Sequence, residues 1–290
     1  METRKVAADI LIHSLASAVL FPRPYRGKGT PVCWDIEERR DVSIAGFRGK
    51  IAWIGPSAEI CEHVTLLPGA ELINAQGLTA IPGFVDAHTH LVFSGDRSNE
   101  FEMRVQGRPY LDILAAGGGI LKTVESVRQR SEDELFQEAL ERAWKVMAWG
   151  VTTLEIKSGY GLDLDSECKT LRVVRRLKET LPISIVATFM GAHAVPKEAK
   201  SNPDAFVDRL CDEWIPVIAR EELARFNDVF TENKAFSVEQ SRRILLAGQK
   251  HGLQPKIHAD EINVLGGVDL AVEIGAVSAD HLLKTGLEGI

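Results

Sequence analysis

The stretch "VTTLEIKSGYGLDLDSECKTLRVVRRLKETLPISIVATFMGAH", residues 151–193, places an amphipathic segment between two apolar runs. The runs 151–158 and 183–193 are rich in β-branched residues and predict buried strands. Residues 165–180, between them, have the apolar spacing of a helix. Two strands joined by a helix run parallel in one sheet, so the stretch predicts a strand–helix–strand unit.

The same alternation of strand and helix extends over residues 81–290. Ser131 and Ser237 precede two of the expected helices as N-caps, and Gly252 and Gly275 follow two as stop signals. Steady alternation of this kind is typical of a doubly wound sheet or of a (β/α)8 barrel. Further strands are expected at 84–90, 228–236, 255–261 and 276–282, and further helices at 132–149, 204–225, 238–251 and 264–274.

The positions of polar residues distinguish these two folds. Five of the eight histidines lie at the ends of expected strands, together with several charged residues. Residues of this kind at nearly every strand end are typical of a barrel rim, whereas an open sheet gathers them at one switch point. We therefore expect an α/β fold, a TIM-type (β/α)8 barrel, in residues 81–290. The strand-end residues are His88, His90, Lys157, Tyr160, His193, Glu232, His258, Glu261, Asp280 and His281.

Residues 1–80 differ from the rest, because they contain short β-rich runs interrupted by Gly, Pro, Asn and Asp. They predict a small β-sandwich-type domain. Only about six barrel strands can be counted, and residue 290 lies just past the sixth. We therefore expect a partial barrel, part of a longer protein whose C-terminal strands complete the barrel.

Composition excludes several classes of protein. The chain is 45% hydrophobic and 26% charged, with a net charge of −7, which disfavours a non-specific nucleic-acid binder. No run approaches the roughly 18 apolar residues of a membrane span. The four cysteines are scattered without a C-x-x-C pair, as in proteins with reduced thiols. We expect a cytoplasmic protein without nucleic-acid or membrane partners.

The histidines predict a metal site. His88 and His90 alternate in an expected strand, so their rings should point to the same face, and His258 ends another strand on the same rim. Three neutral imidazoles suit one Zn²⁺ or iron ion (Fe²⁺ or Fe³⁺) and leave a position for water. The alternative is that His88 and His90 are loop histidines hydrogen-bonded to backbone.

Several further residues are candidates for binding or proton transfer. Glu261 follows His258 by three residues and could act as a general base, or it could cap a helix. Arg97 follows the H-x-H run and could hold a substrate carboxylate, or it could pair with Asp96 or Glu100.

Two glycine-rich segments also qualify as parts of a site. Tyr160 lies between glycines on an expected rim loop, which favours a ligand contact over a core position. Lys157, just before it, could instead be a partner of Glu155. The run "AAGGGI", residues 115–120, is interpreted as an active-site loop.

Five motifs together resemble the imidazolonepropionases of the amidohydrolase superfamily: "PGFVDAHTHLVFSGDRSNEF", "EIKSGYGLD", "FMGAHAVP", "KIHADE" and "SADHL". The H-x-H run is shared across the superfamily, whereas "GDRSNEF" and "IKSGYG" are more specific. The resemblance implies hydrolysis of 4-imidazolone-5-propanoate to N-formimidoyl-L-glutamate in histidine degradation, and a homodimer. It also implies a fourth metal ligand, an aspartate beyond residue 290.

The resemblance further implies residue roles. His88, His90 and His258 match metal ligands, and Glu261 and His281 match the groups that handle protons. The residues that match substrate contacts are Arg97, Tyr160, His193 and Glu261. Two alternatives stay open: a purine or pyrimidine deaminase of the same superfamily, which would have no carboxylate for Arg97 to hold, and a truncated, inactive polypeptide.

Overall fold

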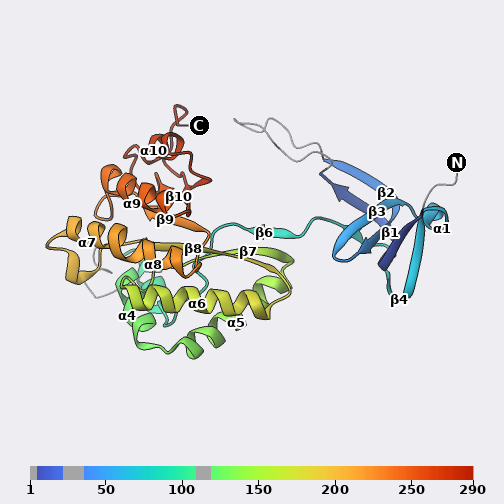
Figure 1. The fold of residues 1–290 in the computed structure, drawn as a ribbon, viewed down its shortest axis with the longest axis horizontal. Helices are drawn as coiled ribbons and strands as arrows, with labels where there is room; N and C mark the ends of the chain where they lie inside the picture. Colours follow the sequence, from blue (N-terminus) through green and yellow to red (C-terminus); the bar gives the residue numbers. More distant parts are fainter. Residues whose placement is uncertain (1–4, 22–35, 109–118, 290) are drawn as a thin grey trace. The chain divides into compact units, whose positions relative to one another are not determined.

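The computed structural model describes residues 5–21, 36–108 and 119–289 (Figure 1). The chain divides into two compact units, Met1–Gly83 and Phe84–Ile290. The run 115–120 lies mostly outside the described residues, with Gly119 and Ile120 at the start of helix α4 (Ile120–Gln129).

The first unit is a mixed β-sheet. In the described residues its strand order is β3 (Lys50–Pro56), β2 (Glu37–Phe47), β1 (Val6–Leu20) and β4 (Val64–Asn74), and β5 (Thr79–Ala80) also pairs with β1. Strand β2 runs antiparallel to both β1 and β3, while β4 and β5 run parallel to β1. Helices η1 (Ser57–Glu59) and α1 (Ile60–His63) connect β3 to β4.

The second unit is a parallel sheet with helices in its connections (Figure 1). Its described strands follow one another in chain order across the sheet, and every neighbouring pair is parallel. This order is that of a partial (β/α)8 barrel rather than a doubly wound sheet. The strands are β6 (Phe84–Asp86), β7 (Val151–Lys157), β8 (Ser184–Ala192), β9 (Phe226–Phe230), β10 (Gln254–Ala259) and β11 (Ser278–His281).

The five helices that the sequence predicts are present, and two of them have clearly different ends. The helix expected over 204–225 is divided by a π-helical segment at Leu210–Trp214 and ends at Arg220. The helix expected over 264–274 is shorter at both ends, and α2, α4 and η2 were not predicted. The described helices are α2 (Ser98–Val105), α4, α5 (Glu132–Ala148), α6 (Leu164–Thr180), η2 (Lys197–Ala199), α7 (Pro203–Arg209), α8 (Ile215–Arg220), α9 (Val238–Lys250) and α10 (Gly267–Glu273).

The expected helix signals are present. Ser131 and Ser237 each form a capping box, in which the serine hydroxyl accepts a backbone N–H and the third helical residue's side chain accepts one in return. Gly252 and Gly275 follow α9 and α10 with φ of 85° and 66°, the left-handed conformation that ends a helix. In the described ranges no helix combines the length and apolarity needed to cross a bilayer.

Strand β6 corrects one expectation. The strand predicted over 84–90 ends at Asp86, so His88 and His90 lie on irregular backbone. The hydroxyl of Thr89 donates to the Glu155 carbonyl at 2.6 Å, and its own carbonyl accepts from the Lys157 N–H at 2.8 Å. These bonds keep the segment beside β7 without a regular ladder. The two rings do lie together, at 5.7 Å between centroids, but not through strand alternation.

Candidate metal centre

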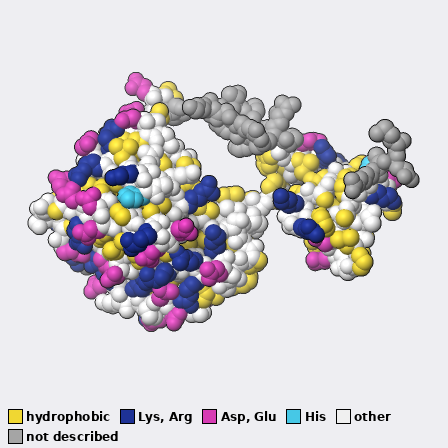
Figure 2. Space-filling model, viewed as in Figure 1, with side chains coloured by type: hydrophobic (Ala, Val, Ile, Leu, Met, Phe, Trp, Pro, Cys, Tyr) yellow, Lys and Arg dark blue, Asp and Glu magenta, His cyan; other side chains and the backbone are white. Residues whose placement is uncertain are grey.

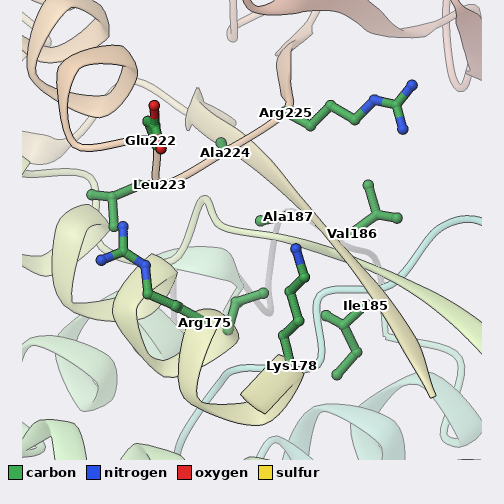
Figure 3. A pocket seen from close by; sticks show the side chains of 10 residues that line it. Arg175, Lys178, Ile185, Val186, Ala187, Glu222, Leu223, Ala224 and Arg225 are labelled. Atoms are coloured by element: carbon green, nitrogen blue, oxygen red, sulfur yellow. The ribbon is translucent and has the colours of Figure 1, made fainter. Parts of the chain in front are cut away.

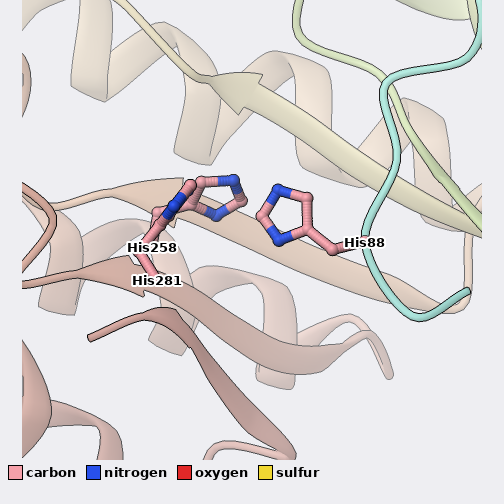
Figure 4. Close-up of side chains that lie close together, drawn as sticks. All are labelled: His88, His258 and His281. Carbon is pink, nitrogen blue, oxygen red and sulfur yellow. The ribbon is translucent and has the colours of Figure 1, made fainter. Parts of the chain in front are cut away.

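Five histidines meet at the carboxyl ends of the parallel strands. His88 and His258 have ring centroids 4.5 Å apart, and His281 lies 4.9 Å from His258 and 5.0 Å from His88. Figure 4 shows His258 and His281 close together with the ring of His88 facing them. His90 stacks on His193, with centroids 4.5 Å apart. The structure therefore brings together all five histidines that the sequence places at strand ends.

Two of these rings are held by buried carboxylates. Nδ1 of His258 lies 3.0 Å from Oδ1 of Asp228, and Nδ1 of His88 lies 3.0 Å from Oδ2 of Asp280. A ring that donates Nδ1–H to a carboxylate keeps a lone pair on Nε2, the form in which histidine binds metals. Nε2 of His258 is buried and has no hydrogen-bond partner in the described part of the chain.

Backbone carbonyls hold two further rings. Nδ1 of His90 lies 3.0 Å from the carbonyl oxygen of Ser158, and Nδ1 of His193 lies 3.2 Å from that of Gly159. Gly159 has φ of 112°, and a Cβ there would lie 2.8 Å from Nδ1 of His193. This position therefore requires glycine. The glycine-flanked loop of the sequence brings backbone acceptors to the histidines.

Burial keeps the inner rings neutral. It lowers the pKa of His90 well below its ordinary value, and the neighbouring His193 adds to the effect. Burial, together with His258, lowers the pKa of His193 to about 3. Burial also lowers the pKa of His281. Neutral imidazoles with pinned Nδ1 atoms and a buried, unpartnered Nε2 are a donor set that fits Zn²⁺ or iron.

The set of three histidines whose ligand atoms lie close together differs from the predicted one. Within the described residues, ligand atoms of His88, His258 and His281 lie within 4.8 Å of one another. The predicted set had His90 in place of His281. The His90 ring lies 5.7 Å from His88 and 5.9 Å from His258 between centroids, because it stacks on His193.

A buried ion-pair network lies next to the histidines. The ammonium of Lys157 lies 2.8 Å from Asp228, 2.9 Å from Asp280 and 3.1 Å from Glu155. Lys256 also pairs with Glu155, at 2.5 Å. Burial alone would lower the pKa of Lys157, but Asp228, Glu155 and Asp280 hold it above its ordinary value. The sequence left open whether Lys157 belongs to a site or pairs with Glu155. The structure contains the pairing with Glu155.

Sequence reasoning gave no role to Asp228 or Asp280. Burial alone would raise the pKa of Asp228, but His258 and Lys157 hold it far below its ordinary range, so it is ionised. Lys157 and His88 have the same effect on Asp280. One signal could have revealed the network: charged residues alternate within buried strands, as in Glu155 and Lys157 of β7.

Tyr160 and Arg97 lie at the edge of the cluster. The ring centroid of Tyr160 is 5.2 Å from that of His90 and 5.4 Å from that of His193. Burial raises the pKa of Tyr160, and the nearby charge of Arg97 opposes this. Arg97 donates to Glu100 from Nε at 3.0 Å and Nη2 at 2.7 Å, so the alternative ion pair is present. That pair does not test whether Arg97 also holds a substrate.

Glu261 lies on the loop after β10. Its Oε2 is 3.7 Å from Nε2 of His281. The N-cap of α10 is Gly266, so Glu261 does not cap that helix. The loop is anchored by Glu232, whose carboxylate accepts from the backbone N–H groups of Ile262 and Asn263, each at 3.0 Å. Glu232 thus holds the loop that carries Glu261.

Elsewhere on this unit the surface carries charges of both signs, interspersed over the face in Figure 2. A hollow of about 300 Å³ lies between α6 and the amino ends of β8 and β9, lined by residues that include Arg175, Lys178 and Arg225 (Figure 3). Because the strands are parallel, this hollow is at the opposite edge of the sheet from the histidines.

The fold is shared with solved structures of other proteins. Three solved structures show the same fold and cover 91–93% of this chain and 55–56% of their own. They are 5-methylcytosine deaminase from Klebsiella pneumoniae (TM-score 0.56, 17% identity), N-isopropylammelide isopropylaminohydrolase from Burkholderia multivorans (0.55, 19%) and atrazine chlorohydrolase from Arthrobacter aurescens complexed with zinc (0.52, 14%).

In sequence, the chain is similar to the imidazolonepropionases. It is 54% identical to the enzyme of Brevibacillus brevis over 251 residues, 46% to that of Myxococcus xanthus over 276, and 44% to that of Alkaliphilus metalliredigens over 283. These matches cover 86%, 94% and 97% of this chain but 59%, 64% and 66% of the relatives. The chain thus spans about three fifths of their length. No family model matches it.

Proposed function

We propose that the protein hydrolyses a ring amide C–N bond of 4-imidazolone-5-propanoate and forms N-formimidoyl-L-glutamate. The observation that carries the proposal is the cluster of five histidines with fixed Nδ1 atoms, next to Tyr160 and the charge of Arg97. The identity of 44–54% to imidazolonepropionases supports this substrate over a purine or pyrimidine.

We assign the metal ligands to His88, His90 and His258. The ring of His90 lies beside those of His88 and His258, at 5.7 and 5.9 Å between centroids, which supports it as the third ligand. His281 is less buried and lies next to Glu261, which favours a role in proton transfer. When bound, Zn²⁺ or iron supplies Lewis-acid chemistry and activates water for attack on a carbonyl carbon.

Glu261 and His281 serve in proton transfer and in stabilising the developing charge. The oxygen of water forms a bond to the ring carbonyl carbon, and the bond from that carbon to the ring nitrogen breaks. Glu261 takes a proton from the water and delivers it to the departing nitrogen. His281, within 3.7 Å of Glu261, is positioned to stabilise the charge that develops on the carbonyl oxygen. The product then carries a new carboxylate.

Substrate binding uses the opposite side of the cluster. The guanidinium of Arg97 holds the propanoate, and Tyr160 and His193 contact the ring. The ion pair with Glu100 orients the guanidinium of Arg97. Anchoring the tail fixes the ring relative to the attacking water. A cytoplasmic location and a homodimer remain part of the proposal.

The test uses the full-length protein, loaded with Zn²⁺ or Fe²⁺, and follows the loss of imidazolone absorbance. We expect turnover in the wild type and a loss of at least a hundredfold in His258→Ala, with the exposed His251→Ala variant unchanged. Absence of imidazolone turnover together with release of ammonia from a purine or pyrimidine would replace the proposal with the deaminase alternative.

A further inference from the structure

A second group of possible cation ligands adjoins the histidine cluster. In the described residues, ligand atoms of Asp228, His258 and Asp280 also lie within 4.8 Å of one another. Asp228 is fully buried, and the side chain of Asp280 is only 13% exposed. Two ionised carboxylates in such a position require a cation, because burying unbalanced charge is costly.

The ammonium of Lys157 occupies this position. It lies 2.8 Å from Oδ2 of Asp228 and 2.9 Å from Oδ2 of Asp280, and its side chain is 0% exposed. A third carboxylate, Glu155, lies 3.1 Å from the same nitrogen. Two N–H groups of the ammonium donate to Glu155 and Asp228, and Asp280 lies within ion-pair distance of the same nitrogen.

The same carboxylates also hold metal-ligand histidines. Asp228 presents Oδ1 to His258 and Oδ2 to Lys157. Asp280 presents Oδ2 to both His88 and Lys157. Lys157 thus contacts both carboxylates that hold Nδ1 of His88 and His258.

Charge balance gives the consequence of removing this ammonium. Three carboxylates (Glu155, Asp228 and Asp280) face two ammonium groups (Lys157 and Lys256), which leaves one net negative charge. Without Lys157 the net charge is −2, which one divalent ion neutralises. Carboxylate oxygens are ligands for Mn²⁺ as well as for Zn²⁺.

We infer that Lys157 is the resident cation of this second position: it positions His88 and His258 through their carboxylates and limits the centre to one bound metal ion. The inference rests on the proposed function only in assigning the first ion to the histidines. It predicts that a neutral residue of similar length at position 157 opens a second divalent-cation site between Asp228 and Asp280.

The experiment measures metal stoichiometry in the full-length protein by equilibrium dialysis against Mn²⁺ or Zn²⁺ and elemental analysis. We expect one ion per chain in the wild type and two in Lys157→Met. Lys256→Met is the matched control, because Lys256 pairs with Glu155 in the same network; we expect it to bind one ion. The Mn²⁺ form of Lys157→Met should also show the electron paramagnetic resonance spectrum of two coupled ions.

The outcomes separate this inference from the proposed function. A folded Lys157→Met protein that binds no more metal than the wild type would overturn the inference. A wild type that binds no metal would refute the proposed metal centre, while a gain of one ion in the variant would still support the role of Lys157. If Lys157→Met does not fold, Lys157→Gln, which removes the charge but keeps N–H donors, is measured against the same expectation.

Discussion

The side chain of His258 donates from Nδ1 to Oδ1 of Asp228 over 3.0 Å, and both side chains are almost completely buried. This bond fixes the orientation of the imidazole ring and leaves Nε2 as the nitrogen that can bind a metal. The metal affinity of the cluster should therefore depend on a residue that does not itself bind the ion.

We expect Asp228→Asn to weaken Zn²⁺ binding by about 10–100-fold, the usual effect of losing a carboxylate behind a ligating histidine. Competition with a chromophoric chelator measures this affinity. The control is Asp212→Asn, a change to an exposed aspartate on the π-helical segment. An Asp228→Asn protein with wild-type affinity would show that the carboxylate does not prepare His258 for metal binding.

Substitution of Arg97 tests whether its guanidinium holds the carboxylate of the substrate. Loss of a charge-assisted pair worth about 1.5–3 kcal/mol should raise KM by about 10–150-fold in Arg97→Ala, with a smaller effect on kcat. Steady-state kinetics of the full-length enzyme measure both constants. Glu100→Gln is the companion variant, because it weakens the competing ion pair and should not raise KM. An unchanged KM in Arg97→Ala would contradict a role of Arg97 in holding the substrate carboxylate.

Glu167 offers a test of how the Tyr160 loop is held. Its buried carboxylate accepts from the backbone N–H groups of Gly159, Gly161 and Leu162, at 3.0, 2.8 and 2.9 Å. Glu167→Gln replaces one acceptor oxygen with a donor, which should lower the free energy of unfolding by about 1–3 kcal/mol. Denaturant titration measures the change, with the exposed Glu179→Gln on the same helix as control. Equal stability of the two variants would contradict this role.

The low pKa of His193 predicts a dependence of stability on pH. The folded-state value of about 3 lies below the usual value of roughly 6.5 in an unfolded chain. The contribution of His193 to the free energy of unfolding is therefore complete above about pH 6.5. It is lost as pH falls from about 6.5 towards 3, because the unfolded state takes up the proton first. Unfolding of metal-free protein at several pH values should show a smaller decline for His193→Gln than for the exposed control His251→Gln. An equal decline of the free energy of unfolding with falling pH in the two variants would argue against the lowered pKa of His193.

The order of the strands and the meeting of the histidines follow from the sequence alone. Parallel strands joined by helices bring their carboxyl ends to one edge, so His193 and His258 had to lie on the same rim. The ion-pair network could not be placed in this way. Lys157 meets Asp228 and Asp280 through packing of three separate strands, and no local pattern specifies which charges pair.

The end of β6 shows a second limit of the sequence pattern. Alternation predicts that His88 and His90 share a strand face, but Thr89 forms its own bonds to β7 and replaces the regular ladder. A threonine hydroxyl that competes for a backbone carbonyl is a tertiary effect, visible only when the neighbouring strand is known.

The most direct measurement is a crystal structure of the full-length, zinc-loaded protein with anomalous data collected at the zinc edge. We expect one anomalous peak per chain, with Nε2 atoms of His88, His90 and His258 at about 2.0–2.1 Å from the ion and His281 beyond bonding distance. An ion held by His88, His258 and His281 without His90, or a peak away from these histidines, would contradict the assigned metal centre.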